Sequence, residues 1–471
     1  MNLPGLLSDI VEMGFLAYFL ALSTCTLALN ALAAWTILRY LGHHPLLGVQ
    51  RREAFGGFLP PVSVIVPAYN EEGTIAATIH SLLQLNYPQF EIIVVNDGSK
   101  DGTLKAAVEA FGLQEFREVH RHDLATRKVR AVYRSLRFPN LRFIDKENGG
   151  KADALNAGIN ASIHPLFCGI DADSILQQDS LVRCVQPFLE DPATICAGGT
   201  IRIANGCRVE GGFLVSTGLP TNPLALAQVV EYLRAFLFGR LAWSPLNALL
   251  VVSGAFGIFH RETVVEAGGY STGTIGEDME LVVRLHATML RKKRRYRIVY
   301  LPDPICWTEA PESLGVLANQ RVRWQRGLAE SLWRHRRLLF SRGSGAVGFL
   351  SMPFLVLFEL LEPLVEVGGI AFFVWSAAFG EISWSTTALF FALVVALGFL
   401  QSINAVFLEE ASFRQFKSLS HIGKLLASAV LENIGYRQLN TWWRLKGLLL
   451  WLAKTRQKWG TMTRSARWSA G

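Results

Sequence analysis

An uncharged stretch near the start of the chain sets the strongest limit on how it can fold. From Gly14 to Leu38 no residue carries a charged side chain. At ~1.5 Å per residue, an α-helix of this length crosses a hydrocarbon core of ~30 Å with some tilt. No basic segment precedes it, so a transmembrane helix fits better than a signal peptide. Because Arg39, Arg51 and Arg52 follow the stretch, we expect the N-terminus outside and the next segment in the cytoplasm.

The overall composition agrees with a membrane protein that also has a soluble part. The chain has 471 residues, 51% of them hydrophobic, and a mean hydropathy of +0.28. Its net charge of +8 could serve nucleic acid, an anionic lipid surface or a phosphate-bearing substrate. The position of the charges favours the last two, and we expect no nucleic-acid partner. Six cysteines without a C-x-x-C pair indicate reduced thiols and no zinc site.

The order of apolar and charged segments divides the chain into five parts. We expect a transmembrane helix (1–45), a cytosolic α/β domain (55–312), an amphipathic interface segment (313–345), two transmembrane helices (346–410), and interfacial helices with a basic cytoplasmic C-terminus (411–471). The later spans are Val347–Phe379 and Ser385–Leu408, with a short fourth helix at Ile422–Tyr436 as an alternative. The sequence thus predicts a multi-pass protein of the inner (plasma) membrane.

Between residues 61 and 301, short apolar runs alternate with polar loops and helical patterns. Val62–Val66, Glu91–Asn96 and Leu141–Asp145 have strand length, and a polar loop follows each of them. Strand, loop and helix in succession predict a parallel, doubly wound sheet whose loops gather at one edge. The apolar segment Pro223–Ala242 contains Glu231 and two arginines, so we expect no membrane span there.

A fourth apolar run, Phe167–Ile170, ends in Asp171-Ala172-Asp173. Carboxylates two residues apart lie on the same side of a strand, and ligands of open α/β sheets bind beyond the carboxyl ends of the strands. Mg²⁺ or Mn²⁺ is typically held by one or two carboxylates together with water and phosphates. A solvated turn is the alternative for an isolated D-x-D, since Asp is common in turns. The surrounding motifs favour a metal and nucleotide site.

Two further loops carry candidate nucleotide ligands. Asp97 follows the second strand, where an acidic residue can accept hydrogen bonds from a ribose or a base edge. A tight turn at Asn96–Ser99 is the structural alternative. Lys151 follows two glycines at the expected start of a helix, where a lysine can meet a bound anion.

Glu277 and Asp278 open an expected helix with an apolar stripe. Carboxylates in a first helical turn are favoured by the helix dipole, which is a sufficient structural reason for them. The functional alternative is a general base that takes a proton from an attacking hydroxyl within hydrogen-bonding reach.

After Pro311 the chain continues with Gln320-Arg321-Val322-Arg323-Trp324 and then with many arginines among bulky apolar residues. This mixture predicts an amphipathic helix on the cytoplasmic lipid face. For most of these arginines we expect lipid contact, with Arg323 and Trp324 as the exceptions.

Three acidic residues in the second predicted span, Glu359, Glu362 and Glu366, share one helical face. Acidic groups at membrane depth are costly unless they face water or a partner. They could therefore pass a hydrophilic polymer along a channel, or they could pair with arginines near the membrane surface. The sequence favours neither alternative.

Taken together, these motifs resemble the processive family 2 glycosyltransferases, which include cellulose, chitin, hyaluronan and poly-N-acetylglucosamine synthases. The resemblance rests on Pro67–Glu72, Asn96–Ser99, Gly150–Ala152, Asp171–Asp173, Gly276–Asp278 and Gln320–Trp324, in that order. It covers roughly residues 60 to 330 and the flanking membrane segments, and Q-x-x-R-W is its most specific motif. The segment Asn148–Gly158 is most similar to the poly-N-acetylglucosamine branch.

The resemblance implies a GT-A fold, a UDP-sugar donor, and inversion at the anomeric carbon. Among the nucleotide-sugar ligands, Glu71 and Asp97 would hold the uridine part, with Tyr69 beside them. Lys151 would hold the nucleotide or its phosphates, and Asp171 and Asp173 the Mg²⁺ or Mn²⁺. Asp278, next to Glu277, would be the catalytic base. Pyrophosphate and acceptor sugar would be held by Gln320, Arg323 and Trp324.

We therefore expect a membrane-embedded enzyme that polymerises UDP-N-acetylglucosamine or UDP-glucose into a β-linked polysaccharide and moves it across the membrane. A non-processive enzyme that makes a glycolipid is the near alternative, and a channel or scaffold subunit without catalysis is an alternative from another class. Three spans make a thin channel, so a second copy of the chain or a small membrane subunit is an expected partner, besides membrane lipids.

Overall fold

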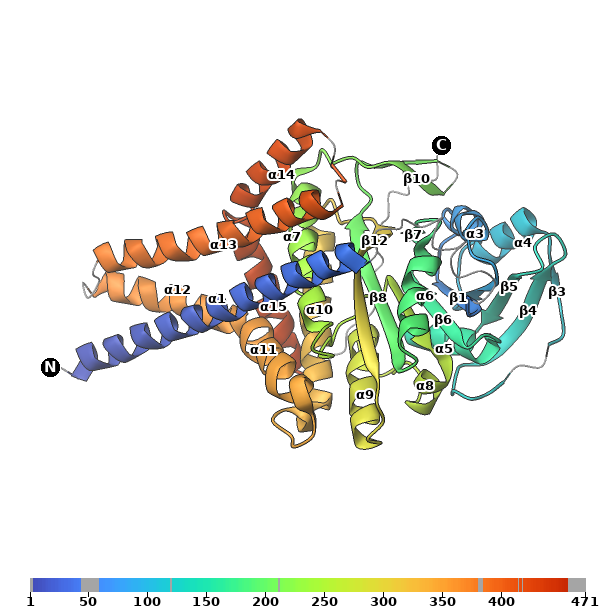
Figure 1. Ribbon diagram of the computed structural model, residues 1–471, viewed down its shortest axis with the longest axis horizontal. Coiled ribbons are helices and arrows are strands. Elements are labelled where there is room, and N and C mark those ends of the chain that lie inside the picture. Colours follow the sequence, from blue (N-terminus) through green and yellow to red (C-terminus); the bar gives the residue numbers. More distant parts are fainter. Residues whose placement is uncertain are drawn as a thin grey trace.

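The structure is a computed structural model that describes residues 3–43, 59–118, 121–210, 212–379, 384–413, 415–416 and 418–455. It has two parts (Figure 1). One is an α/β domain around a single large sheet. The other is a set of long helices, α1, α12 and α13, that run side by side away from this domain. The predicted basic tail, from residue 456 on, lies outside the described residues, as do Arg51 and Arg52.

The centre of the sheet is parallel, as predicted. Its adjacent strands are β5 (Leu141–Lys146), β2 (Phe90–Asn96), β1 (Val62–Ala68) and β6 (Leu166–Ile170). These strands are almost wholly buried, as expected where helices cover both faces of a parallel sheet. Ala68 pairs with Asn96, and Asn96 pairs with Asp145. The loops that follow β1, β2 and β5 therefore leave the sheet side by side.

The whole sheet is mixed, and in this respect the prediction of a parallel sheet was wrong. β11 (Phe256–His260) lies antiparallel between β6 and β8 (Thr194–Ile203). The other members are β3 (Leu113–Glu115), β4 (Val129–Ser135), β12 (Arg297–Thr308) and β7 (Ile175–Leu176), and a separate hairpin joins β9 (Arg208–Glu210) and β10 (Phe213–Ser216). A strand-length run reveals burial but not direction, since the connections that fix direction are long.

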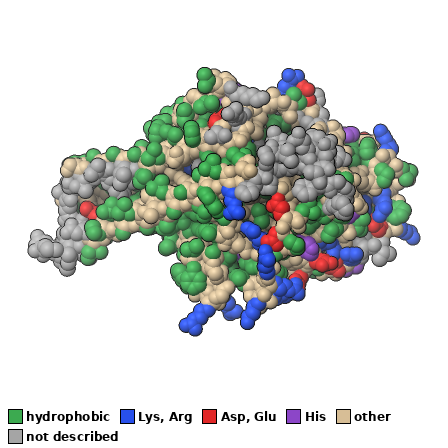
Figure 2. All heavy atoms as spheres, in the orientation of Figure 1, with side chains coloured by type: hydrophobic (Ala, Val, Ile, Leu, Met, Phe, Trp, Pro, Cys, Tyr) green, Lys and Arg blue, Asp and Glu red, His purple; other side chains and the backbone are tan. Residues whose placement is uncertain are grey.

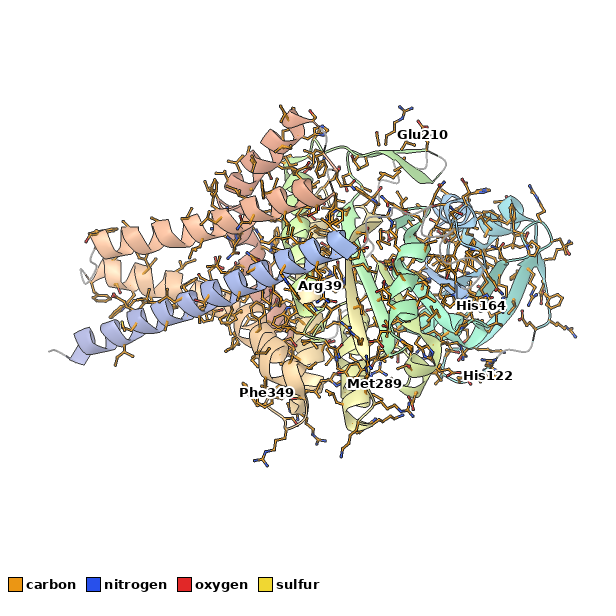
Figure 3. All side chains as sticks on the ribbon, in the orientation of Figure 1. Arg39, His122, His164, Glu210, Met289 and Phe349 are labelled. Carbon is orange, nitrogen blue, oxygen red and sulfur yellow. The ribbon has the colours of Figure 1, made fainter. Side chains whose placement is uncertain are left out.

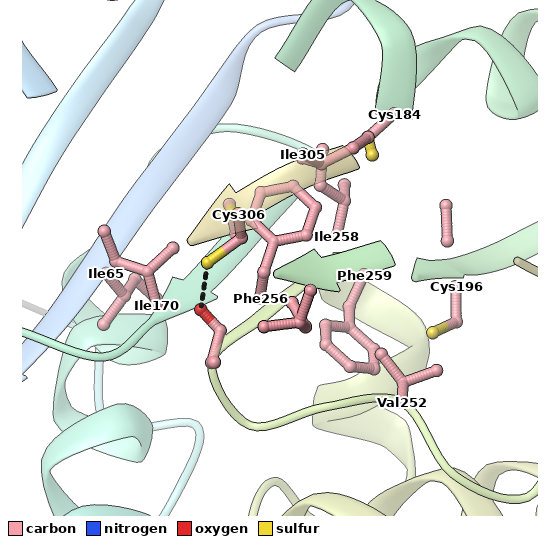
Figure 4. Packing of buried hydrophobic residues seen from close by; sticks show 14 of the residues in the cluster. Ile65, Ile170, Cys184, Cys196, Val252, Phe256, Ile258, Phe259, Ile305 and Cys306 are labelled. Atoms are coloured by element: carbon pink, nitrogen blue, oxygen red, sulfur yellow. Dashed lines mark hydrogen bonds between the residues drawn. The ribbon is translucent and has the colours of Figure 1, made fainter. Parts of the chain in front are cut away.

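Helices cover the sheet and form one apolar core with it. They are α3 (Ile75–Leu83), α4 (Thr103–Phe111), α5 (Lys151–Ala161), α6 (Ser180–Glu190), α7 (Pro223–Leu233), α8 (Arg261–Glu266) and α9 (Glu277–Arg291). α5 packs so closely on β1 that a Cβ on Gly158 would lie 2.2 Å from Ile65. Figure 4 shows Ile65, Ile170, Phe256 and Cys306 packed together at the end of β6. This rigid packing supports the loop that contains Asp171.

The Q-x-x-R-W motif lies on α10 (Leu314–Arg334), which packs between α9 and α15 (Tyr436–Leu452). Much of α10 is buried, including Gln320, Arg321 and Gln325. Exposed bulky side chains such as Trp333 and Phe340 lie instead at its end and around the short turn η4 (Arg336–Leu338) that follows. The predicted amphipathic segment after the motif is therefore not one continuous helix, because α10 ends at Arg334 and the short turn η4 follows. Lipid contact of this segment stays a prediction.

One helix of the described residues is long and apolar enough to cross a membrane: Ile10–Gly42, within α1 (Leu3–His43). The second predicted span is divided. It forms the turns η5 (Val347–Ser351), α11 (Met352–Leu355) and η6 (Val356–Leu360), breaks at Leu361, and continues as α12 (Glu362–Ala378). The third corresponds to α13 (Trp384–Ser412), and α14 (Leu419–Leu431) follows it. The part of the chain that the structure describes therefore does not confirm a multi-pass arrangement.

Candidate functional site

Four loops meet at the carboxyl edge of the parallel strands, and hydrogen bonds join the first two of them. Asn70, with φ 57°, turns the chain after β1 and accepts from the backbone of Lys100. The Glu71 backbone donates to Thr103, and Glu72 accepts from Gly102. Tyr69 is exposed beside them. Tyr69 and Glu71, both predicted to bind the donor, are thus held next to the loop of Asp97.

Asp97 is buried and organises the third loop. Its carboxylate accepts from Lys146 Nζ at 2.5 Å and from the backbone N–H groups of Gly149 and Gly150, at 3.0 and 2.7 Å. Lys146 also pairs with Asp153, at 2.6 Å. Sequence reasoning missed Lys146, because a lysine at the end of an apolar strand looks solvent-exposed until the partners that bury it are known. Asp97 therefore holds in place the glycine loop that precedes Lys151.

Lys151 stands at the centre of the site. It begins α5 after Gly150, whose φ of 89° suits glycine. Its Nζ lies 2.5 Å from Asp171 and 3.5 Å from Glu277, and it donates to the Gly254 carbonyl at 3.3 Å. Burial opposes the charge of Lys151, but the carboxylates of Asp171 and Glu277 outweigh it and raise its pKa. A cation is therefore fixed between two motifs that lie far apart in the sequence.

Asp278 lies next to this cation at the start of α9. Its Oδ2 accepts from the Gly254 N–H at 2.9 Å, and its Oδ1 accepts from the Met279 N–H at 2.8 Å. A Cβ on Gly254 would lie 3.0 Å from Lys151 Nζ and 3.2 Å from Asp278 Oδ2, so a side chain there would displace these two groups slightly. Burial raises the pKa of Glu277, and the positive charge of Lys151 partly offsets this rise. Asp278 is less buried than Glu277 and so is the better placed of the two to meet a substrate hydroxyl.

The Asp171-Ala172-Asp173 loop follows β6 directly. Thr78 holds it by donating to the Ala172 carbonyl at 2.5 Å, and Asp171 is partly exposed. In the part of the chain that the structure describes, no group of three or more His, Cys, Asp or Glu side chains could hold a metal alone. Two carboxylates at a strand end nevertheless fit Mg²⁺ or Mn²⁺ of the kind completed by substrate phosphates. The donor set therefore suits a metal that arrives with a nucleotide.

α10 brings the aromatic part of the site. The Trp324 side chain is 44% exposed, and its ring centroid lies 6.5 Å from that of Tyr232 on α7. Arg321 stacks on Trp324 at 4.4 Å and forms an ion pair with Glu231 at 2.7 Å. Gln320 is buried, and its Oε1 has no hydrogen-bond partner among the described residues. Arg323 is half-buried on the same helix. Sequence reasoning missed Tyr232 and the Glu231–Arg321 pair, which form only across helices.

The three acidic channel candidates lie beside α15. Glu359 and Glu362 both pair with Arg444, which also donates to Gln325 of α10 at 3.0 Å. Glu366 instead accepts from the Thr441 hydroxyl at 2.6 Å. Of the two alternatives, pairing with an arginine is the one that these contacts favour for Glu359 and Glu362.

Comparison with known proteins agrees with this arrangement. Residues 63–213 match the family described as Glycosyl transferase family 2, and residues 167–400 match Glycosyl transferase family group 2. Together these matches run from residue 63 to residue 400. The chain belongs to the family 2 glycosyltransferases.

Two curated relatives show which members of the family the chain is similar to. The chain is 32% identical over 279 residues to the poly-beta-1,6-N-acetyl-D-glucosamine synthase of Staphylococcus aureus (strain MSSA476), covering 59% of this chain and 56% of the relative. It is 30% identical over 274 residues to the synthase of the same description from Staphylococcus epidermidis, covering 58% and 56%. The chain thus matches a little over half the length of these relatives.

A solved structure supports the fold. The mannosyltransferase from Pyrobaculum calidifontis, determined in complex with GDP-Man and Mn²⁺, superposes with a TM-score of 0.51 at 19% sequence identity. The match covers 88% of this chain and 99% of that one. It confirms the predicted GT-A-like α/β fold.

Proposed function

We propose that the protein is an inverting glycosyltransferase of the membrane that polymerises a UDP-activated sugar into a β-linked polysaccharide. The observation that carries this proposal is the convergence of Asp171, Lys151, Glu277 and Asp278, from three separate loops, on one point at the edge of the sheet. UDP-N-acetylglucosamine is the preferred donor, since the matched relatives are described as poly-N-acetylglucosamine synthases. UDP-glucose is the second donor to test.

The donor would bind across the loops at the strand ends. Tyr69, Glu71 and the loop organised by Asp97 would hold the uridine, and Lys151 would face the phosphates. Asp171 and Asp173 would hold Mg²⁺ or Mn²⁺, which when bound neutralises charge on the diphosphate as it departs. Lys151 and Arg323 would add fixed positive charge, which stabilises the transition state more than the bound donor.

Asp278 would act as the general base. In the proposed step an acceptor hydroxyl oxygen forms a bond to the anomeric carbon while the bond from that carbon to the diphosphate oxygen breaks. The hydroxyl proton passes to Asp278, and UDP leaves with the electron pair. The Gly254 and Met279 N–H groups orient the carboxylate for this transfer. The exposed face of Trp324 suits a sugar ring of the acceptor, and Gln320 offers a buried carbonyl oxygen nearby.

The membrane arrangement belongs to the same proposal. α1, α12 and α13 would be three spans, with the N-terminus outside and both the α/β domain and the C-terminus in the cytoplasm. In Figure 2, hydrophobic side chains cover the described surface over these helices, while charged side chains gather over the α/β domain and the lower edge. Leu20, Leu27 and Val374 are among the exposed apolar residues. The polymer would leave along the spans.

The turn after α10 would rest on the inner leaflet. Trp333, Phe340 and Phe349 are all at least half exposed there, and Arg336 stacks on Trp333 at 4.7 Å. Phe349 is labelled in Figure 3 at the edge of the helical part, on the opposite side of the molecule from Glu210. Exposed aromatic side chains beside arginines suit the headgroup region of an anionic leaflet.

The test is to offer the purified, lipid-reconstituted protein UDP-N-acetylglucosamine and UDP-glucose separately, each with Mg²⁺ or Mn²⁺, and to measure UDP release and product size. We expect UDP release from one donor and a long polymer. The Asp278→Asn variant is the matched control, since it should bind UDP without turnover.

Two results would contradict the proposal. A product that carries mostly one sugar on a lipid would identify an enzyme that makes a glycolipid. Absence of UDP release with either donor would favour a channel or scaffold subunit without catalysis.

A further inference from the structure

The start of α9 and the middle of α10 touch through two glycines. A Cβ on Gly276 would lie 2.9 Å from Cα of Gly327, and a Cβ on Gly327 would lie 2.9 Å from Cα of Gly276. Real Cβ atoms are essentially never this close to backbone, so a side chain at either position would push the helices apart. Gly276 is two residues before Asp278, and Gly327 is three residues after Trp324. The contact therefore joins the two motifs of the proposed reaction.

Glu330, one helical turn after Gly327, fastens the loop that leads into α9. Its Oε2 accepts from the Ile275 backbone N–H at 2.9 Å and from the Thr274 hydroxyl at 3.1 Å. The Ile275 N–H lies just before the helix, where no intrahelical carbonyl is available to it. A carboxylate from another helix thus fixes the position at which α9 begins.

A second link joins the same two helices further along. Glu280, which is almost wholly buried, accepts from Arg284 on its own helix and from Nε2 of His335 at the end of α10, at 3.0 Å. Arg334 donates to the Ser271 hydroxyl at 2.6 Å, in the loop before α9. The start of α9 is therefore held from α10 at several points, and Glu330 holds the two residues that come just before Gly276.

We propose that Glu330 is a positioning residue that fixes the start of α9, and with it Asp278, at a set distance from Arg323 and Trp324 on α10. Glu330 does not touch the substrate in this account. It acts through the Ile275 N–H and the Thr274 hydroxyl. The inference rests on the proposed function, since it takes Asp278 as the base and α10 as the acceptor side.

The test compares Glu330→Ala with Glu330→Gln. The alanine variant loses both hydrogen bonds and should lower kcat by roughly 10- to 100-fold, because an error of ~1 Å in the position of a catalytic group has an effect of this size. Its donor KM and its affinity for UDP, measured by calorimetry, should stay within about twofold, since the donor loops are untouched. The glutamine variant keeps an acceptor oxygen and should retain most of kcat. Glu109→Ala, which removes an exposed ion pair on α4, is the control.

A second variant and a second measurement keep the test decisive. Thr274→Val removes one of the two hydrogen bonds and should give a smaller loss of kcat even if Glu330→Ala folds poorly. Amide hydrogen exchange of residues 271–280 should rise in Glu330→Ala and not in Glu330→Gln, whatever the donor sugar is. If wild type is inactive with both donors but exchange rises as expected, the proposed function fails, while the structural part of the inference, that Glu330 fixes the start of α9, stands.

Two results would overturn the inference. One is a kcat within about twofold of wild type in Glu330→Ala with unchanged exchange. The other is a parallel loss of UDP affinity and kcat, which would show that Glu330 supports the donor site or the fold in general and not the placement of Asp278.

Discussion

Acidic residues are used differently at the candidate site of the α/β domain and around the long helices of this protein. At the edge of the sheet, Asp97 and Asp278 accept from backbone N–H groups, and Asp171 shares the single lysine Lys151 with Glu277. Around the helices, arginines from distant segments pair with the glutamates: Glu231 with Arg321, Glu359 and Glu362 with Arg444, Glu409 with Arg202 of β8, and Glu432 with Arg234. The first arrangement keeps Asp171 and Asp278 at the loop surface, where a metal or a proton can reach them, whereas the second holds helices in place.

This difference bears on the proposed polymer path. Glu359 and Glu362 share one arginine, Arg444, so both carboxylates are held in an ion pair. Glu366 has a hydroxyl partner, Thr441, and within the described ranges no arginine forms an ion pair with it. Of the three channel candidates, Glu366 is therefore the one best suited to contact a passing sugar hydroxyl.

The largest expected effect is the loss of the base. Asp278→Asn should lower kcat by ~10²- to 10⁴-fold, because an amide cannot take the proton of the acceptor. UDP affinity should be unchanged, since the amide still accepts from the Gly254 N–H. Single-turnover kinetics together with calorimetry measure both. Substantial residual turnover would remove Asp278 from the base role.

Removal of an acidic residue that pairs with an arginine beside the long helices should instead lower stability. Arg202 and Glu409 form a pair that is almost wholly buried, between β8 and α13. Glu409→Gln should lower the free energy of unfolding by about 3 kcal/mol, because it leaves a buried guanidinium without its counter-charge. Donor KM should stay the same.

Replacing both partners, as Arg202→Met with Glu409→Leu, should recover much of that stability. Melting temperature and KM, measured side by side, check this. Activity that falls without a change in melting temperature would contradict the division between the two regions.

The Glu280 link predicts a pH dependence of stability. Burial opposes its charge, but hydrogen bonds from His335 and Arg284 outweigh burial and lower its pKa from 4.5 to about 2. The folded state therefore gains stability that is complete above the ordinary pKa and is lost as pH falls from about 4.5 toward 2. The full contribution is about 3 kcal/mol.

Thermal unfolding between roughly pH 5 and pH 3 measures this dependence. Glu280→Gln should be less stable than wild type at pH 6, and the difference should shrink as pH falls. A difference that is constant across this range would exclude titration of Glu280 as the cause.

The smallest effect is expected at Trp324, on the border between the two regions. Trp324→Ala should raise the acceptor KM by about tenfold through the loss of an apolar stacking surface, with donor KM unchanged. Trp324→Phe should be closer to wild type. Assays with short oligosaccharide acceptors measure this, and an effect confined to the donor would move Trp324 away from the acceptor side.

The loops at the strand ends could be predicted from the sequence because their pattern is local. An apolar run followed by Asp97 or by Asp171-Ala172-Asp173 specifies a buried strand with a carboxylate at its end, and parallel strands bring such ends together. The start of α9 was also predicted from a local pattern, since Glu277 and Asp278 come directly before an apolar stripe of helical spacing.

The rest depends on partners that lie far apart in the chain. Lys146 is explained by Asp97 and Asp153, and Arg444 by glutamates some eighty residues earlier. The antiparallel direction of β11 and the covering of α10 by α15 follow from tertiary packing. Hydrophobic periodicity does not reveal either of them. Glu330 has no local pattern that distinguishes it from any other helical glutamate.

In the proposed donor site, carboxylates from separate loops would surround a diphosphate together with its metal. Calorimetry of UDP binding with Mn²⁺ and with chelator, for wild type and Asp173→Asn, tests this arrangement most directly. The account predicts that wild type binds UDP at least about tenfold more tightly with Mn²⁺ and that Asp173→Asn loses this gain. Equal affinity with and without the metal, or a metal effect that Asp173→Asn leaves intact, would contradict it.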